Sequence, residues 1–453
     1  MGNIRVIIGK ERLLTPSGLG IISEIFGNSG LLNFAAKQRT EKRSQPQIKN
    51  DDIFLTEIAL LALGKTDFED VNEFHTDDEL YEKVIGIKHG IPSESTLRMR
   101  LNEIGQKCNK EILQMNVNLL KVCGVEPSVL PCGLVPVDID VTPFDNSNSK
   151  KEGVSRTYKN FAGYAPIIAY IGEEGYMCNC ELREGKQHCQ KGTPEFLEET
   201  IYAAKKTTDK TLLIRMDSGN DALDNMALLH WADSKIKFLI KRNFRREDKL
   251  NTAEELKKVC KNIAKPRDGK TVYIGSTYRE FFDKKIGNFT VRAVYEITER
   301  TTDADGQQFI EPETEINMYW TSLGCSDEDV IELYHNHAVC EQYHSELKSD
   351  MNVERLPSGK FDTNALVLKL AMIAFNILRI IGTQAMRGND APNPKKVRRR
   401  RLKTIIENLM LIASHFTVHA RNYTLSLGKS SFWADTFIRI INFFKMNTEV
   451  LID

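Results

Sequence analysis

Two aspartates lie in or directly after short stretches that have the pattern of β-strands. Asp140 lies in Val135–Val141, where apolar and acidic residues alternate, and Asp217 follows the apolar stretch Leu212–Met216. Functional side chains of an α/β sheet gather at the ends of its central strands. Two carboxylates about 4 Å apart repel each other by about 4 kcal/mol at an effective dielectric constant near 20, and a divalent cation relieves that repulsion. The pair therefore predicts a magnesium site for phosphoryl transfer, although each aspartate alone is typical of an ordinary strand end.

A predicted helix over about 327–350 offers a third carboxylate on a polar stripe. Glu341 belongs to four side chains spaced at i, i+3, i+7 and i+14, which at about 100° per residue fall within about 60° of one another. These are Tyr334, His337, Glu341 and Lys348. Glu332 and Glu346 fall outside the stripe. The stripe fits a metal ion and a phosphate backbone, whereas the alternative is an ordinary amphipathic helix with a polar face.

Basic residues are clustered although the chain as a whole is neutral. The sequence has 62 basic and 62 acidic residues, but Lys395–Lys403 holds seven basic residues in nine and Lys235–Lys249 seven in fifteen. Such patches suit DNA phosphates, and solvated surface is the alternative. The side chains that we expect to follow DNA are Lys241, Arg242, Arg245, Arg246, Arg398, Arg399, Arg400 and Arg401.

Nine cysteines at irregular spacing suit a reducing cytoplasm. The tightest group, Cys178, Cys180, His188 and Cys189, offers a weak alternative: a zinc site, although this spacing is unusual for zinc. Two roles are possible for Trp320: stacking on an extruded DNA base, or packing in the core as part of a strand. We favour the core role.

No segment of the sequence predicts a targeting signal or a membrane span. The apolar stretch at the N-terminus is too short for a secretory signal. The apolar stretch Ala365–Ile381 is interrupted by Lys369, Asn376 and Arg379, so we expect a buried helix. Phosphate-binding motifs of the forms GxxxxGK[ST] and GxGxxG are absent from the sequence, which argues against a nucleotide cofactor.

The elements that must position these residues divide the chain into five regions. We expect a helical region at 1–130, which suits a DNA-end-binding module or a plain helical packing domain, and then an α/β core at 131–249 with the order strand-strand-strand-helix-strand-helix-strand, which is RNase H-like. A β-rich insertion at 250–323 follows. The helix that carries Glu341 completes the core at 324–385, and residues 386–453 are expected to be helical.

Several motifs together resemble those of DDE insertion-sequence transposases of bacteria. The spacing Tyr-x2-His-x3-Glu-x6-Lys is similar to the family's Tyr-x2-Arg-x3-Glu-x6-Lys signature, and DIDVT and IRMDSGND resemble its first two acidic motifs. Similar stretches elsewhere are WTS before the helix, GYAPIIAYIGEEGYMCNCELREG, PSESTLRMRL and NALVLKLAMIAFNILRI. The resemblance thus covers most of the chain.

The resemblance implies a metal-binding triad of Asp140, Asp217 and Glu341 that holds two Mg²⁺ or Mn²⁺ ions. Asp138 faces the same side of its strand as Asp140 and is the rival first carboxylate, but the Asp-x-Thr match favours Asp140. Tyr334 and Lys348 match positions that contact DNA near the cleaved end. His337 departs from the family's arginine and lacks its permanent charge and its bidentate fork.

The implied function is cut-and-paste transposition. The enzyme would bind terminal inverted repeats, hydrolyse the DNA strand and join the freed 3′-hydroxyl to target DNA, as a homodimer that pairs two ends. The alternative is a decayed or repurposed protein that binds DNA without cutting it, which the presence of all three acids disfavours.

Overall fold

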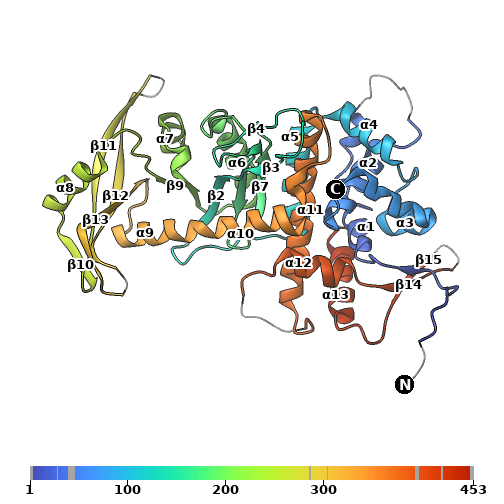
Figure 1. Ribbon diagram of the computed structural model, residues 1–453. Coiled ribbons are helices and arrows are strands. Elements are labelled where there is room, and N and C mark those ends of the chain that lie inside the picture. The colour runs from blue at the N-terminus through green and yellow to red at the C-terminus, as the bar shows by residue number, and fades with distance from the viewer. Residues whose placement is uncertain are drawn as a thin grey trace.

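A computed structural model of the chain describes residues 4–27, 29–38, 46–284, 287–303, 305–392, 397–419 and 422–448. Its centre is a sheet of nine strands (Figure 1). From one edge to the other these are β10 (Asn262–Arg267), β11 (Lys270–Asp283), β12 (Gly287–Thr302), β13 (Gln308–Thr321), β9 (Ile236–Lys241), β8 (Leu212–Met216), β2 (Val135–Val141), β6 (Ile167–Ile171) and β7 (Tyr176–Glu181).

Five of these strands form an RNase H-like core, as predicted. β2 pairs antiparallel with β6 and parallel with β8, and β8 pairs parallel with β9. The helices α6 (Thr193–Thr207) and α7 (Leu223–His230) make the two crossovers that parallel neighbours require. β8 is buried along its whole length, as is typical of a central strand covered on both faces. The predicted α/β fold class is therefore confirmed.

The insertion extends the core sheet. β13 pairs with β9 from Tyr319↔Lys241 to Thr321↔Leu239, and β12, β11 and β10 follow outward, with α8 (Lys249–Val259) beside them. Its strands are far longer than the stretches 271–274, 289–297 and 316–323 that their apolar residues predict. The outer halves of β11 and β13 are exposed on both faces, so no apolar alternation marks them.

One nearly continuous helical rod carries Glu341 across the sheet (Figure 1). It consists of α9 (Asp327–His335), a 3₁₀ turn over Asn336–Val339, α10 (Cys340–Ser345) and a π-helical turn over Glu346–Asp350. The Ser326 hydroxyl accepts a hydrogen bond from the Asp329 backbone N–H and caps its start.

The long helix α11 (Phe361–Arg387) separates the core from a helical lobe (Figure 1). Within the described ranges it is the one helix long and apolar enough to cross a membrane, and its apolar stretch is entirely buried inside the protein. Its interrupting polar groups find partners there. Lys369 Nζ donates to Asn179 (2.8 Å), and Asn376 donates to Asn116 (2.7 Å) and to the Met177 carbonyl (2.8 Å).

Both ends of the chain build the helical lobe. Its helices are α1 (Leu19–Gly27), α2 (Asn50–Ala62), α3 (Asp78–Ile85), α4 (Glu94–Ile104) and α13 (Ala434–Thr448), whereas α5 (Asn109–Val122) packs on α6, α11 and β7, and the short α12 (Leu402–Ile405) packs on α11. α1 packs on α13. The hairpin of β14 (Ser414–His419) and β15 (Asn422–Leu427), which pairs with β1 (Leu13–Leu14), lies in a region where the sequence predicted helix alone.

Candidate active site

Asp140 and Asp217 lie side by side at the ends of two parallel strands. Ile139 of β2 is in register with Met216 of β8, so the next residue of each strand is an aspartate. Burial and then the negative charge of Asp140 raise the pKa of Asp217 above its ordinary value. Asn220 Nδ2 donates to Asp217 Oδ1 over 2.8 Å and fixes that carboxylate. The two carboxylates therefore repel each other in a largely desolvated place.

Glu341 approaches the same place from the helical rod. It lies on α10, which packs against β2, and its side chain is exposed. The phenol of Tyr158 lies in the field of these acids, because partial burial and then the charges of Asp140 and Asp217, among others, raise its pKa. Its hydroxyl donates to the Val141 carbonyl over 3.1 Å. Tyr158 lies in a loop without periodicity, so no signal in the sequence pointed to it.

Asp138 has a different environment from Asp140. Its Oδ1 accepts from Arg215 Nε (2.6 Å) and His337 Nδ1 (2.9 Å), and its Oδ2 accepts from Arg215 Nη2 (2.8 Å). Burial alone would raise the pKa of Asp138, but Arg215 and His337 hold it below its ordinary value. Arg215 Nη1 also donates to the Leu333 carbonyl over 2.7 Å. This buried cluster therefore fastens the rod to the sheet.

The other members of the polar stripe are also engaged within the protein. Tyr334 packs on Tyr319 with ring centroids 4.6 Å apart, and burial followed by the charge of Asp217 raises its pKa. His337 is buried on Asp138. Lys348 Nζ donates to the Pro143 carbonyl and pairs with Glu354, both over 2.9 Å.

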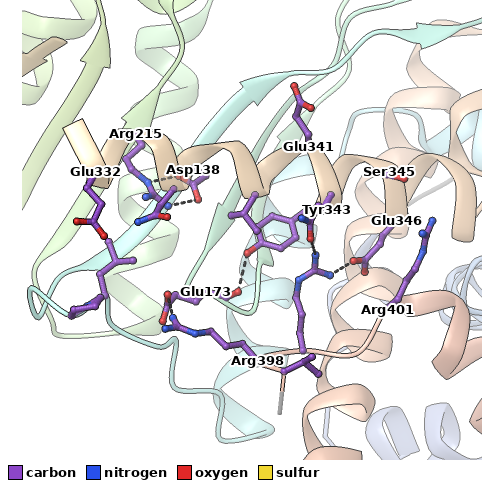
Figure 2. Close-up of a pocket in the computed structure, with 17 residues that line it drawn as sticks. Asp138, Glu173, Arg215, Glu332, Glu341, Tyr343, Ser345, Glu346, Arg398 and Arg401 are labelled. Atoms are coloured by element: carbon purple, nitrogen blue, oxygen red, sulfur yellow. Dashed lines mark hydrogen bonds and ion pairs between the residues drawn. The ribbon is translucent and has the colours of Figure 1, made fainter. Parts of the chain in front are cut away.

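Figure 2 shows the side of the rod that lies opposite Glu341. Glu341 points away from Glu332 and Glu346, as the helical wheel predicts. The side of Glu346 faces a cavity of about 930 Å³. Arg398 and Arg399 reach across it from the C-terminal region.

The arginine run is tied to acidic groups near this cavity. Arg398 pairs with Glu173, Arg399 with Glu346, and Arg401 with Asp350 over 2.8 Å. The Arg400 guanidinium lies over the Trp433 ring, 5.2 Å from its centroid. Lys395 and Lys396 lie outside the described residues.

The basic group after β9 is divided between the interior and the surface. Arg242 is buried between the rings of Phe244 and Trp320. Arg245 Nη2 donates to the Asp221 carbonyl over 2.6 Å, whereas Lys241 is half-buried and Arg246 exposed. Trp320 is 3% exposed. The preference for Trp320 as a core residue is therefore confirmed.

The predicted cysteine group does not form a metal cluster. The thiols of Cys178 and Cys180 donate to the carbonyls of Thr200 and Leu368, on different helices. Burial raises the pKa of Cys178 to about 12 and that of Cys180 to about 11, so both stay protonated. Among the described residues, the sets whose ligand atoms all lie within 4.8 Å of one another include neither this group nor Asp140, Asp217 and Glu341 together.

His344 and Cys340 are the neighbours of Asp140 that sequence reasoning missed. His344 Nε2 lies 3.4 Å from Asp140 Oδ2 and 3.4 Å from Cys340 Sγ. The helical spacing contained a signal for His344. With Tyr334 set at 0° on the helical wheel, residue 344 falls at about 280°, about 20° from His337.

Comparison with known proteins identifies the family of this chain. A search of curated proteins finds no match. Among solved structures, the chain is similar to piggyBac transposase in a cryo-EM structure of its synaptic complex with hairpin DNA. The two share 12% identity over 86% of this chain and 76% of the other, with a TM-score of 0.39. The sequence model of the family "Transposase DDE domain group 1" matches residues 3–447. Since this match spans nearly the whole chain, the protein belongs to the DDE transposase family.

Proposed function

We propose that this protein is an active transposase that cuts DNA at the ends of its own element and joins the freed 3′-hydroxyl to target DNA. The observation that supports the proposal is the register of β2 with β8, which puts Asp140 and Asp217 at neighbouring positions, together with Glu341 on α10, which packs on β2. Membership of the transposase family supports the same chemistry. The alternative, a DNA-binding protein that has lost cleavage, is an outcome of the test below.

The donor set fits a hard divalent cation. Carboxylate oxygens are the protein ligands that Mg²⁺ prefers, and burial and the charge of Asp140 raise the pKa of Asp217, a repulsion that a bound cation relieves. When bound by Asp140, Asp217 and Glu341, two Mg²⁺ or Mn²⁺ ions would supply an activated water or 3′-hydroxyl and a stabilised leaving oxygen.

The chain's own residues set this geometry. Asn220 orients the Asp217 carboxylate, and the cluster of Asp138, Arg215 and His337 holds the rod at a fixed height above the sheet. Glu341 is therefore carried by an element that is fixed to the sheet, as the precise positioning of a site residue requires.

Double-stranded DNA is the proposed partner, both as terminal inverted repeats and as target, in the cytoplasm of a bacterium. We propose Lys241 and Arg246 as phosphate contacts, because they remain accessible at and just after the end of β9. Two copies would pair two ends in one complex.

Cleavage of the element's own ends tests the proposal. With Mg²⁺, the wild-type protein should nick an oligonucleotide that carries the inverted repeat, and Asp217→Asn and Glu341→Gln should each lower the rate at least about 10³-fold while end binding persists. Glu332→Gln is the matched control, since Glu332 is an exposed glutamate on the other side of the same rod. Normal nicking by both active-site variants would reject the assignment, and end binding without cleavage by the wild type would favour the alternative.

A further inference from the structure

Three ligand atoms of different kinds converge beside the active site. They are Asp140 Oδ2 of β2, and Cys340 Sγ and His344 Nε2 of α10, and all lie within 4.8 Å of one another. Cys340 and His344 are one helical turn apart, so both project from the same side of α10. Both are almost fully buried, whereas the Asp140 side chain is 24% exposed and opens the cluster to solvent.

The spacing matches a tetrahedral soft-metal site. Zinc binds sulfur at about 2.3 Å and nitrogen or oxygen at about 2.1 Å, so tetrahedral angles place sulfur and nitrogen about 3.6 Å apart and nitrogen and oxygen about 3.4 Å apart. Here His344 Nε2 lies 3.4 Å from Cys340 Sγ and 3.4 Å from Asp140 Oδ2. Two of the three separations therefore match those of a tetrahedral ion, and the third lies within 4.8 Å.

The second nitrogen of His344 is held as metal-binding histidines usually are. Nδ1 lies 3.2 Å from the hydroxyl of Tyr170, which is itself buried. A Nδ1–H donated to that oxygen leaves the Nε2 lone pair facing the thiol and the carboxylate. Two electron-rich atoms, Nε2 and Oδ2, then face each other without a proton between them, an arrangement that a cation stabilises.

We propose that Asp140, Cys340 and His344 form a binding site for a soft divalent ion such as Zn²⁺ or Co²⁺, distinct in its ligands from the carboxylate triad but sharing Asp140. Sulfur and imidazole ligands select such ions over Mg²⁺. Binding replaces the thiol proton of Cys340 by the metal and releases that proton to the buffer.

The site would oppose DNA cleavage, and this consequence rests on the proposed function. An ion bound by Cys340 and His344 occupies Asp140 Oδ2 and withdraws that oxygen from the triad. Zinc in excess should therefore inhibit Mg²⁺-dependent cleavage by the wild type, and Cys340→Ser should relieve the inhibition at least about tenfold.

Cobalt titration of the reduced, metal-free, full-length protein without DNA tests binding itself. We expect one Co²⁺ per chain, with a thiolate-to-cobalt charge-transfer band in the near ultraviolet that Zn²⁺ abolishes. Cys340→Ser should lose the band, and His344→Gln should weaken binding at least about tenfold. Cys189→Ser is the matched control, because that half-buried thiol donates to the Gly219 carbonyl beside Asp217, outside the proposed site.

A band that persists in Cys340→Ser, that vanishes in Cys189→Ser or that never forms would overturn the site. Zinc X-ray absorption of the wild type covers the case in which a variant fails to fold: one sulfur ligand is expected, and a shell of oxygen and nitrogen alone contradicts the proposal. If the wild type binds cobalt as described but cuts no DNA, the proposed function fails while the metal site stands.

Discussion

At the scale of single residues, two aspartates of one strand have opposite roles. Asp138 and Asp140 face the same side of β2. In the sequence, only the Asp-x-Thr match favoured Asp140 over Asp138 as the first carboxylate of the triad. The structure distinguishes them by their partners. Both carboxylate oxygens of Asp138 accept hydrogen bonds from Arg215 and His337, whereas the Asp140 side chain is partly open to solvent. His337, which departs from the family signature, contacts Asp138 through Nδ1 over 2.9 Å.

Substitution of each aspartate should separate stability from chemistry. Asp138→Asn leaves the buried Arg215 without its counter-charge, so we expect the free energy of unfolding to fall by about 3–5 kcal/mol. Asp140→Asn should change it by less than about 1 kcal/mol but abolish nicking. Urea unfolding beside a nicking assay measures both. Equal losses of stability in the two variants would contradict the distinction drawn here.

At the scale of elements, prediction succeeded where burial leaves a pattern. The bounds of β2 follow from its alternation of apolar and acidic residues, and those of β8 from its short apolar stretch. The outer parts of β11 and β13 could not be predicted, because an exposed two-sided ribbon has no apolar face. For the site, residue spacing on an ideal helical wheel selected Glu341 as a candidate carboxylate. It could not show that Tyr334 and His337 turn inward against Tyr319 and Asp138.

The helix α2 should make the protein sensitive to alkaline pH. Burial and then the charge of Asp70 raise the pKa of Glu57 to about 8. A carboxyl whose folded pKa is raised stabilises the fold fully only below its unfolded pKa near 4.5, and this stability is lost as the pH rises through the folded value. From pH 6 to 9 the free energy of unfolding should fall by about 3 kcal/mol.

Glu57→Gln should remove that pH dependence, measured by thermal unfolding across the range. Glu126→Gln is the control, since Glu126 is exposed and should leave the slope unchanged. A wild-type protein equally stable at pH 6 and 9 would show that Glu57 ionises without cost.

At the scale of the whole molecule, the helical lobe, the extended sheet and the rod are each held together by segments that lie far apart in the sequence. β1 near the N-terminus pairs with β14, and the insertion joins the core through β9 and β13 (Figure 1). The arginine run Arg398–Arg401 joins the C-terminal region to the rod through Glu346 and Asp350. Sequence analysis could not separate these arginines from DNA contacts, because both roles have the same composition.

DNA binding should distinguish the two basic groups. Lys241→Ala and Arg246→Ala should each weaken binding to any duplex and lower the slope of log K against log salt by about 1. Arg399→Gln should leave that slope unchanged and instead destabilise the contact with Glu346. Fluorescence anisotropy at several salt concentrations measures the slopes. A reduced slope for Arg399→Gln alone would reverse the assignment.

The central claim is that three carboxylates, distant along the chain, share a divalent-cation site. Iron-directed backbone cleavage tests this most directly: Fe²⁺ replaces Mg²⁺ in the DNA-free protein, ascorbate and peroxide are added, and the fragments are mapped by mass spectrometry. The account predicts cuts near residues 140, 217 and 341 that excess Mg²⁺ suppresses and that Asp217→Asn removes. Cuts confined to other segments, such as the pair of Asp52 with His89 in the helical lobe, would contradict it.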